Sequence, residues 1–449
     1  MTVAVVVDRP LPWHARLAAA TPGAVVTTDA SSSAEVMLDL RSEGRPRPGT
    51  WAFEIGLGGL GGLDQPGVRE LARGERACPV RLVQVETAGV RVLRQGVLEL
   101  RGEDPASVSA DVLRRLADWP RWALAAPGPV GDVVPLWDVL PPAQVSSAWI
   151  RRRRLRRRWE QVMVRERWAV GRCEGLTLAD LVAGAELPDP EWAAEPPNAY
   201  LADPFACPGS AHLLVERLDL SGPSHPGTLV EVEWTPGGIL LPRGEGPVSV
   251  GHLSYPSAFS HDGDTWCVPE SAAEGGLALW RRGTQGWQRV RQLLDQPAVD
   301  ADLWQQDGHW WLFYSLEGPD KNEELHLASA PDLQAPFLPH PLNPVVRDVS
   351  AARGGGRPFL VDGRLYRPAQ DCTTSYGGGL AIVEIYRLST EDFAQRVVRR
   401  FGPRAPYPDG LHTLNAWNGG LVLDAKRHET SWRSLGRKLA RRMVPRASA

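Results

Sequence analysis

The sequence reads DPFACPGSAHLLVE at positions 203–216 and YPSAFSHDGDTWCVPE at 255–270. The same pattern, a polar head followed by an apolar strand, a turn glycine and a second strand, returns three more times. These copies read DADLWQQDGHWWLFYS (300–315), GRPFLVDGRLYRPAQ (356–370) and HTLNAWNGGLVLDAK (412–426). The turn glycines recur at intervals of roughly 45 to 56 residues, which is the size of a four-stranded propeller blade.

Three of the turns are Asp-Gly pairs, the strongest short signal for a β-hairpin. Further strand-like runs lie between the repeats, at 227–234, 276–281, 324–329 and 381–387. Five such units between about 170 and 430 would close a ring that leaves no free sheet edge. A two-sheet β-sandwich is the main alternative, but it would not explain the even spacing. We therefore expect a mainly β protein with a five-bladed β-propeller at 169–428.

The region before the repeats predicts a small α/β domain at 1–130. Strands are expected at 2–7, 25–28, 35–40 and 51–55, a helix at 14–20, a hairpin at 81–85 and 90–100, and a helix at 110–126 that Pro120 interrupts. The glycine-rich segment GLGGLGGL (56–63) fits the GxGxxG spacing. Because Pro66–Gly67 follows where a phosphate-binding helix would open, we interpret it as a flexible loop.

Residues 67–74 (GVRELARG) and the hairpin ending at Arg94–Val97 resemble the N-terminal half of methionyl-tRNA formyltransferases. Those enzymes handle the formyl group with an Asn-x-His pair, and residues 1–130 contain no such pair. The resemblance therefore implies a degenerate formyltransferase-like domain without catalysis.

A basic helical connector is expected at 131–168, with one helix over Ser147–Arg167. Seven of the eight residues in Arg151–Arg158 are arginines. Such a helix either links two domains as a solvated element or meets an anionic partner, such as a phospholipid surface or a sugar phosphate. The C-terminal tail, 429–449, repeats the basic amphipathic pattern and suits an anionic membrane interface or packing on the protein itself.

The bulk composition excludes several classes of protein. The 449 residues carry a net charge of −3, so nucleic acid is not an expected partner. Five cysteines without a CxxC pair argue against a disulfide framework and a zinc site. No cofactor motif and no metal site are predicted. We expect a cytoplasmic protein, placed at the inner membrane face if the basic segments bind lipid.

The polar heads of the five repeats are the candidate site, because the inner strands of a propeller end around one axis. The heads contain Asp203, Tyr255, Asp300, Arg353 with Arg357, and His412. A polar residue follows each turn glycine by seven positions: Glu216, Glu270, Ser315, Gln370 and Lys426. Glu270 and Gln370–Asp371 are the most suggestive of these. Trp and Tyr side chains, Tyr376 among them, could stack on sugar faces.

Several motifs around these heads resemble a known family. They are ADPF (202–205), GHLSYP (251–256), VPES (268–271), GRLYRPAQDC (363–372) and GLHTLN (410–415). Together they are similar to the propeller domain at the N-terminus of plant glucosamine inositolphosphorylceramide transferases, which also occurs in bacterial formyltransferase-like proteins. The resemblance covers about 165–425 and implies a carbohydrate-handling propeller. In the plant enzymes sugar transfer resides in a separate domain, which this sequence does not resemble.

The propeller is also similar in design to arabinanase- and xylosidase-type glycoside hydrolases. That resemblance implies that Asp203 is a general base and that Asp300 orients and tunes a partner. The family's acid is a glutamate in the fourth blade, where this sequence has Arg353–Arg357 without a carboxylate. Glu270 or Asp371 could supply the acid instead. Alternatively, Arg353 and Arg357 could bind the phosphate of a sugar phosphate or nucleotide sugar.

Two functions from different classes follow from these residues. The first is an enzyme that makes or breaks a glycosidic bond in cell-surface glycan synthesis, as a glycosyltransferase, phosphorylase or hydrolase. Its catalytic residues would be Asp203, Glu270, Asp300 and Asp371, and its substrate-binding residues Tyr255, Arg353, Arg357, Gln370, Tyr376 and His412. The second is a non-catalytic carbohydrate-binding module that presents substrate to a partner glycosyltransferase.

Overall fold

The computed structural model describes residues 2–7, 12–21, 23–28, 34–41, 46–60, 63, 65–125, 133–137, 145–221 and 226–430. The chain divides into two compact units. Unit 1 is Met1–Arg157 with Arg347–Val349, and unit 2 is Arg158–Val346 with Ser350–Ala449. Among the described residues, no helix combines the length and the hydropathy that crossing a bilayer requires.

Unit 1 contains a mixed eight-stranded sheet in the order β2-β1-β3-β4-β6-β7-β8, with β5 beside β4. The strands are β1 (Val3–Val6), β2 (Ala24–Thr27), β3 (Val36–Asp39), β4 (Trp51–Ile55), β5 (Gly59–Leu60), β6 (Ala77–Val85), β7 (Val90–Glu99) and β8 (Val133–Val134). The helices are α1 (Pro12–Ala20), α2 (Val68–Ala72), α3 (Pro105–Leu116) and α4 (Trp119–Ala125). Leu17, Phe53 and Leu116 meet in one buried core, which joins the helices to the sheet.

Two predictions in unit 1 are corrected. Helix α3 begins at Pro105, five residues before the predicted start, because Asp104 caps it: its carboxylate accepts from Ser107 N–H at 2.9 Å. The predicted interruption of the helix is confirmed: α3 ends at Leu116 and α4 begins at Trp119, so Pro120 lies in the first turn of α4, where a missing N–H costs nothing. The first part of the glycine-rich segment forms a 3₁₀ turn (Gly56–Gly58) and strand β5, in place of the predicted loop.

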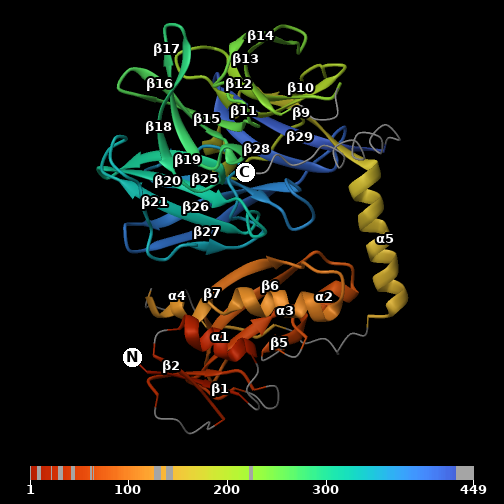
Figure 1. Ribbon diagram of the computed structural model, residues 1–449, viewed down its shortest axis with the longest axis vertical. Coiled ribbons are helices and arrows are strands. Elements are labelled where there is room, and N and C mark those ends of the chain that lie inside the picture. Colours follow the sequence, from red (N-terminus) through yellow and green to blue (C-terminus); the bar gives the residue numbers. More distant parts are fainter. Residues whose placement is uncertain are drawn as a thin grey trace. The chain divides into compact units, whose positions relative to one another are not determined.

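Unit 2 is a five-bladed β-propeller, as predicted (Figure 1). Blade 1 is β11 (Ala199–Ala206), β12 (Leu213–Asp219), β13 (Thr228–Trp234) and β14 (Leu240–Glu245), and blade 2 is β15 (Ser254–His261), β16 (Asp264–Glu270), β17 (Leu277–Gly283) and β18 (Gly286–Leu294). Blade 3 is β19 (Ala298–Gln306), β20 (His309–Leu316), β21 (Glu324–Ala330) and β22 (Leu338–Pro339), with β23 (Val346–Arg347) beside β21. Blade 4 is β24 (Phe359–Val361), β25 (Arg364–Asp371), β26 (Gly379–Leu388) and β27 (Phe393–Phe401).

Blade 5 joins the two ends of the propeller sequence. It contains β28 (Gly410–Trp417), β29 (Gly420–Thr430), β9 (Val164–Cys173) and β10 (Glu191–Trp192), in the order β10-β9-β29-β28. Strand β9 pairs with β29 along its whole length, from Val164↔Thr430 to Cys173↔Leu421. This pairing closes the ring, because it joins strands from the two ends of the propeller sequence in one blade. The short helix α6 (Leu178–Ala183) lies between β9 and β10 in the chain.

The ring closure corrects the predicted helix over Ser147–Arg167. Helix α5 (Ser147–Met163) ends four residues earlier, because Val164–Arg167 belong to β9 and pair with β29. The basic tail was predicted at 429–449, and its residues 431–449 lie outside the described part of the chain.

The hairpin turns have the geometry that their sequences demand. In the three Asp-Gly turns and in Asn418–Gly419, both central residues have positive φ, between 47° and 81°. A two-residue loop with two positive φ angles is the type I′ turn, whose twist matches that of the flanking strands. These turns fix the register of the first two strands in blade 3 and of the equivalent strands in blades 2, 4 and 5.

Candidate functional site

Blades 1, 2 and 3 carry a strained residue at the same position of their innermost strand. Asp203, Tyr255 and Asp300 have φ angles of 49°, 43° and 45°, in the left-handed region that a side chain disfavours. Each lies at a shift in register between the first two strands of its blade. Such bulges turn a side chain away from the regular alternation and occur often beside functional sites. In three blades the bulge therefore sets the orientation of the predicted head residue.

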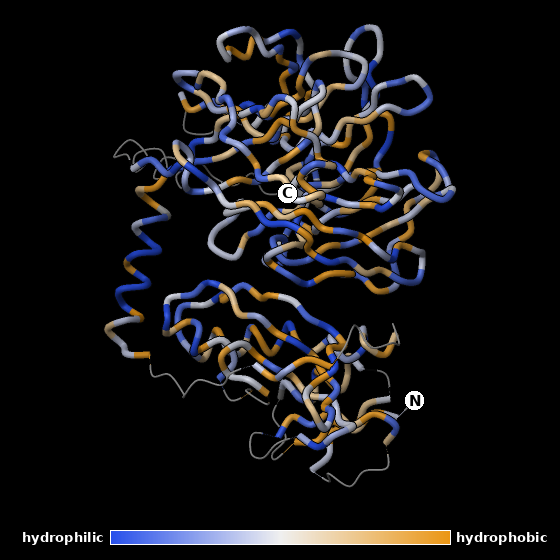
Figure 2. Tube along the Cα trace, turned by 180° about the vertical axis from the view of Figure 1, so that it is seen from behind, coloured by the Kyte–Doolittle hydropathy of each residue, from blue (hydrophilic) through white to orange (hydrophobic). Residues whose placement is uncertain are grey.

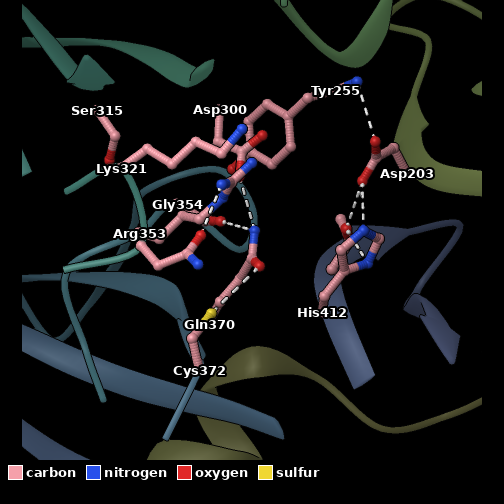
Figure 3. A network of polar contacts seen from close by, with 12 residues as sticks. Asp203, Tyr255, Asp300, Ser315, Lys321, Arg353, Gly354, Gln370, Cys372 and His412 are labelled. Carbon is pink, nitrogen blue, oxygen red and sulfur yellow. Dashed lines mark hydrogen bonds and ion pairs between the residues drawn. The ribbon is translucent and has the colours of Figure 1, made fainter. Parts of the chain in front are cut away.

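Asp203 is 5% exposed and lies among donors from two other blades. Its carboxylate accepts the N–H of Tyr255 at 3.1 Å and the hydroxyl of Thr413 at 2.8 Å, and Nε2 of His412 lies 3.4 Å away (Figure 3). Burial raises the pKa of Asp203 to about 6, with the nearby Asp424 adding to the rise and His412 opposing it. A carboxyl group with this pKa can accept and release a proton near neutral pH.

His412 lies between two carboxylates. Its Nδ1 donates to Oδ1 of Asp424 at 2.6 Å, and its ring stacks on Trp168 with centroids 3.9 Å apart. Burial alone would lower the pKa of His412, but Asp424 and Asp203 outweigh burial and raise it. The charged imidazolium form of His412 is therefore more favoured than in a free histidine, and its charge neutralises part of the cluster.

Asp203, His412 and Asp424 also offer three atoms within 4.8 Å of one another, as a metal site would. Nδ1 of His412 already hydrogen-bonds Asp424. A metal ion bound by these three residues would therefore have to displace the proton on Nδ1. The sequence expectation of no metal site stays a prediction.

Asp300 is held by a different set of groups. Its Oδ2 accepts from Nε of Arg353 at 2.5 Å and from the side-chain amide of Gln370 at 2.7 Å. Arg353 also donates to Asn322 at 2.9 Å and lies over the ring of Tyr376, 4.6 Å from its centroid. Figure 3 shows Asp300, Arg353 and Gln370 beside Asp203 and His412. The arrangement fixes the orientation of Asp300, and its carboxylate can accept a hydrogen bond from one further donor.

That donor is Glu270, which is partly exposed and hydrogen-bonds Asp300. Burial raises the pKa of Glu270 well above its usual value, with the charge of Asp300 adding to the rise and Arg353 opposing it. Burial also raises the pKa of Glu216, whose neighbours Asp203 and Glu270 add to the rise. Both glutamates therefore keep their proton to a higher pH than an ordinary glutamate does, and Glu270 is the accessible one.

Three predicted site residues have other partners. The hydroxyl of Tyr255 donates to Asp302 at 2.9 Å and accepts from Gly356 N–H at 2.7 Å, so it ties blade 2 to blades 3 and 4. Arg357 donates to the carbonyl of Ala258 at 2.8 Å. Asp371 pairs with Arg400 at 2.6 Å.

The remaining predictions come together around Asp300. Gln370 and Arg353 bind it, and the ring of Tyr376 is contacted by Arg353, Lys426 and His412. These contacts give Tyr376 a packing role in addition to any contact with a ligand. The predicted aromatic platform for a sugar is therefore enclosed by charged neighbours.

Sequence reasoning did not place Glu216, Asp424 and Thr413 in the site. The sequence marked Glu216 as one of the polar residues seven positions after a turn glycine, as it marked Glu270, but gave it no role. The register confirms the equivalence: Glu216 pairs with Ala202 and Glu270 with Ser254, each beside a bulged head residue. Asp424 shares its position with no carboxylate of another repeat, so no pattern pointed to it.

A family model supports the similarity of the propeller. Residues 232–432 match the model described as glucosamine inositolphosphorylceramide transferase 1, N-terminal. The curated protein of that name from Oryza sativa subsp. indica is 34% identical over 175 residues, which cover 37% of this chain and 23% of the relative. The Arabidopsis thaliana protein is 30% identical over 241 residues, covering 50% and 30%. The chain thus spans less than a third of these relatives.

Solved structures of glycoside hydrolases are similar at low identity. A family 117 glycoside hydrolase from Zobellia galactanivorans has a TM-score of 0.37 at 13% identity, covering 64% of this chain and 99% of that one. An α-L-arabinofuranosidase from Lactobacillus brevis has a TM-score of 0.37 at 12% identity, covering 53% and 87%. The strand order of the five blades, not these scores, carries the fold assignment. The formyltransferase-like character of unit 1 stays a prediction.

Proposed function

We propose that the centre of the propeller acts on a sugar and makes or breaks a glycosidic bond. The observation that carries the proposal is the pair Glu270 and Asp203, two carboxyl groups of one cluster whose pKa values are both raised. Glu270 is partly exposed and its pKa lies well above the usual value, and burial raises the pKa of Asp203 to about 6. Two carboxyl groups of this kind can serve as the acid and the base of glycosidic chemistry.

In the proposed reaction Glu270 gives its proton to the leaving glycosidic oxygen. Asp203 takes a proton from the attacking hydroxyl, which comes from water or from an acceptor sugar. Asp300 positions Glu270 through their hydrogen bond and keeps its pKa high. The surrounding carboxylates stabilise the positive charge that develops on the sugar ring in the transition state.

The arginine contacts favour a neutral sugar over a phosphate-bearing one. Arg353 already pairs with Asp300, and Arg357 is bound to a backbone carbonyl with its guanidinium over the ring of Phe259. Neither is free to form the bidentate contact by which arginine binds phosphate. The carboxyl groups, in contrast, suit the hydroxyls of a sugar as acceptors and donors.

The test is turnover of a panel of neutral oligosaccharides, aryl glycosides and nucleotide sugars by the wild type and three variants. Glu270→Gln should lower kcat about 10²–10⁴-fold because the leaving oxygen then lacks its proton. Asp203→Asn should lower it as well. Glu274→Gln, an exposed carboxyl one turn further along the chain, is the matched control and should keep full activity. Wild-type activity that survives Glu270→Gln would sink the proposed roles.

The second candidate function is a carbohydrate-binding module without catalysis. The ion pair of Asp300 with Arg353 favours it, because a carboxylate neutralised by a fixed arginine is a common structural device. This function predicts a thermal shift with an oligosaccharide, no turnover in the wild type, and binding that Glu270→Gln retains. Turnover lost in Glu270→Gln would exclude it.

A further inference from the structure

Helix α5 carries a concentration of positive charge that the proposed sugar site does not use. Its 17 residues contain seven arginines and one acidic residue, Glu160. Figure 2 colours most of the helix as hydrophilic. Burial and the neighbouring Arg157 and Arg76 lower the pKa of Arg153 to about 10, as expected where cations crowd together.

One side of α5 is already engaged within unit 1. Trp149 packs against the hydrophobic core of that unit, and Arg153 lies over the Trp149 ring. Arg154 pairs with Glu103 at 2.8 Å, and Arg157 donates to the carbonyl of Gly102 at 3.2 Å. These residues hold the helix and account for part of its charge.

The other side of α5 combines exposed apolar groups with arginines. Leu155 is 66% exposed and Trp159 is 50% exposed, and a spacing of four residues puts them on one face. Arg151, Arg152 and Arg158 are exposed as well, and each is three or four positions from Leu155. The basic apolar face, as we call these five residues, has a hydrophobic centre and a cationic rim.

This combination distinguishes between the anionic partners of a helix. Phosphates of a nucleic acid would pair with the arginines but would leave Leu155 and Trp159 in water. At an anionic bilayer surface the two apolar side chains enter the interface, while the arginines reach the lipid phosphates. The net charge of −3 also gives the whole chain no general attraction to nucleic acid.

We propose that the basic apolar face of α5 is a docking surface for a bilayer that contains anionic lipid. Each arginine near such a surface contributes about 1 kcal/mol, and an apolar centre adds attraction that salt does not screen. The helix lies on the surface and does not cross it, because its charge forbids burial in the hydrocarbon core. The proposal is independent of the chemistry at the propeller centre.

The experiment is sedimentation of the full chain with vesicles of phosphatidylcholine alone or mixed equally with phosphatidylglycerol. The wild type should bind the mixed vesicles and not the neutral ones. The variant Arg151→Gln/Arg152→Gln/Arg158→Gln should partition roughly 100-fold more weakly. The control Arg217→Gln/Arg289→Gln/Arg364→Gln removes the same charge from exposed positions of unit 2 and should bind as the wild type does.

A second variant, Leu155→Gln/Trp159→Gln, separates lipid from nucleic acid. Vesicle binding should fall roughly tenfold or more because the apolar centre is lost. Three results would overturn the proposal: vesicle binding that the α5 arginine variant retains, equal losses in the arginine variant and its control, or binding to an oligonucleotide but not to vesicles.

Discussion

Buried carboxylates are neutralised in two different ways in the two units. In unit 1, fully buried Glu54 pairs with one arginine, Arg81, whose Nε lies 2.8 Å from its Oε2. Arg81 stacks on the ring of Trp137, 4.0 Å from its centroid, and the backbone N–H of Trp137 donates to the other carboxylate oxygen. The pair is thus complete, one cation for one anion.

At the propeller centre the acidic groups outnumber the cations. Five carboxyl groups, Asp203, Glu216, Glu270, Asp300 and Asp424, act on one another and share the cations His412 and Arg353. Burial raises the pKa values of three of the five, and the charges of the neighbouring carboxylates add to the rise, so bound protons supply part of the missing positive charge. An arginine cannot give up its proton, whereas a carboxylic acid can, so an excess of carboxyl groups suits chemistry and a matched pair suits stability.

The largest expected effect tests the matched pair. Arg81→Ala leaves Glu54 buried without its cation and should lower the free energy of unfolding by about 3–5 kcal/mol. Chemical denaturation followed by circular dichroism of the full chain measures the loss, read in the transition of unit 1. The control is Arg73→Ala, which breaks an exposed pair with Glu75 and should cost less than about 1 kcal/mol. Equal costs would contradict the comparison.

The next effect tests the acidic cluster at the propeller centre, and here the mutation should increase the stability of the protein. Because the folded pKa of Asp203 is raised from 3.8 to about 6, its ionisation weakens the fold as pH rises through that range. Asp203→Asn removes this loss. The variant should therefore become more stable relative to the wild type by roughly 1–3 kcal/mol between pH 4 and pH 8.

Unfolding of both proteins at several pH values measures this difference, and the difference between the two curves isolates Asp203 from the other groups. Asp332→Asn, an exposed carboxyl outside the cluster, is the control and should show no such slope. If the wild type instead became more stable relative to Asp203→Asn as pH rises, the carboxylate of Asp203 would be stabilised in the folded state. The explanation that protons replace missing cations in the cluster would then fail.

The blades were predictable because their signals are local. Each turn of the type Asp262–Gly263 dictates a hairpin by the φ angles that only such residues adopt readily, and the repeat supplies five instances of the pattern. The end of α5 was not predictable in this way. Val164–Arg167 continue a basic helical pattern, and only their pairing with β29, more than 250 residues later, makes them a strand.

The site was predictable to the extent that repetition marks it. Asp203 and Asp300 stand out because equivalent heads carry them, and their bulges confirm that the positions are special. The partners of Arg357 and Asp371 depend on which strand lies beside each of them, and this cannot be derived from the repeat pattern. In the structure Arg357 contacts the carbonyl of Ala258, and Asp371 pairs with Arg400. Asp424 escaped notice because its role comes from His412 across the hairpin.

The smallest effect concerns a single hydrogen bond at Asp203. The hydroxyl of Thr413 donates to its carboxylate at 2.8 Å and lowers its pKa, against the upward effect of burial. Thr413→Val keeps the shape of this buried side chain but removes the donor, so the pKa of Asp203 should rise by up to about one unit, or about 1.4 kcal/mol. The pH at which wild type and Asp203→Asn diverge in stability should then move upward in the Thr413→Val background.

Thr413→Ser restores the hydroxyl and should restore the midpoint, which a loss of packing alone would not allow. If the midpoint stays near pH 6 without the hydroxyl, Asp203 is governed by its charged neighbours alone, and the distinction from the hydrogen-bonded ion pair of unit 1 becomes sharper.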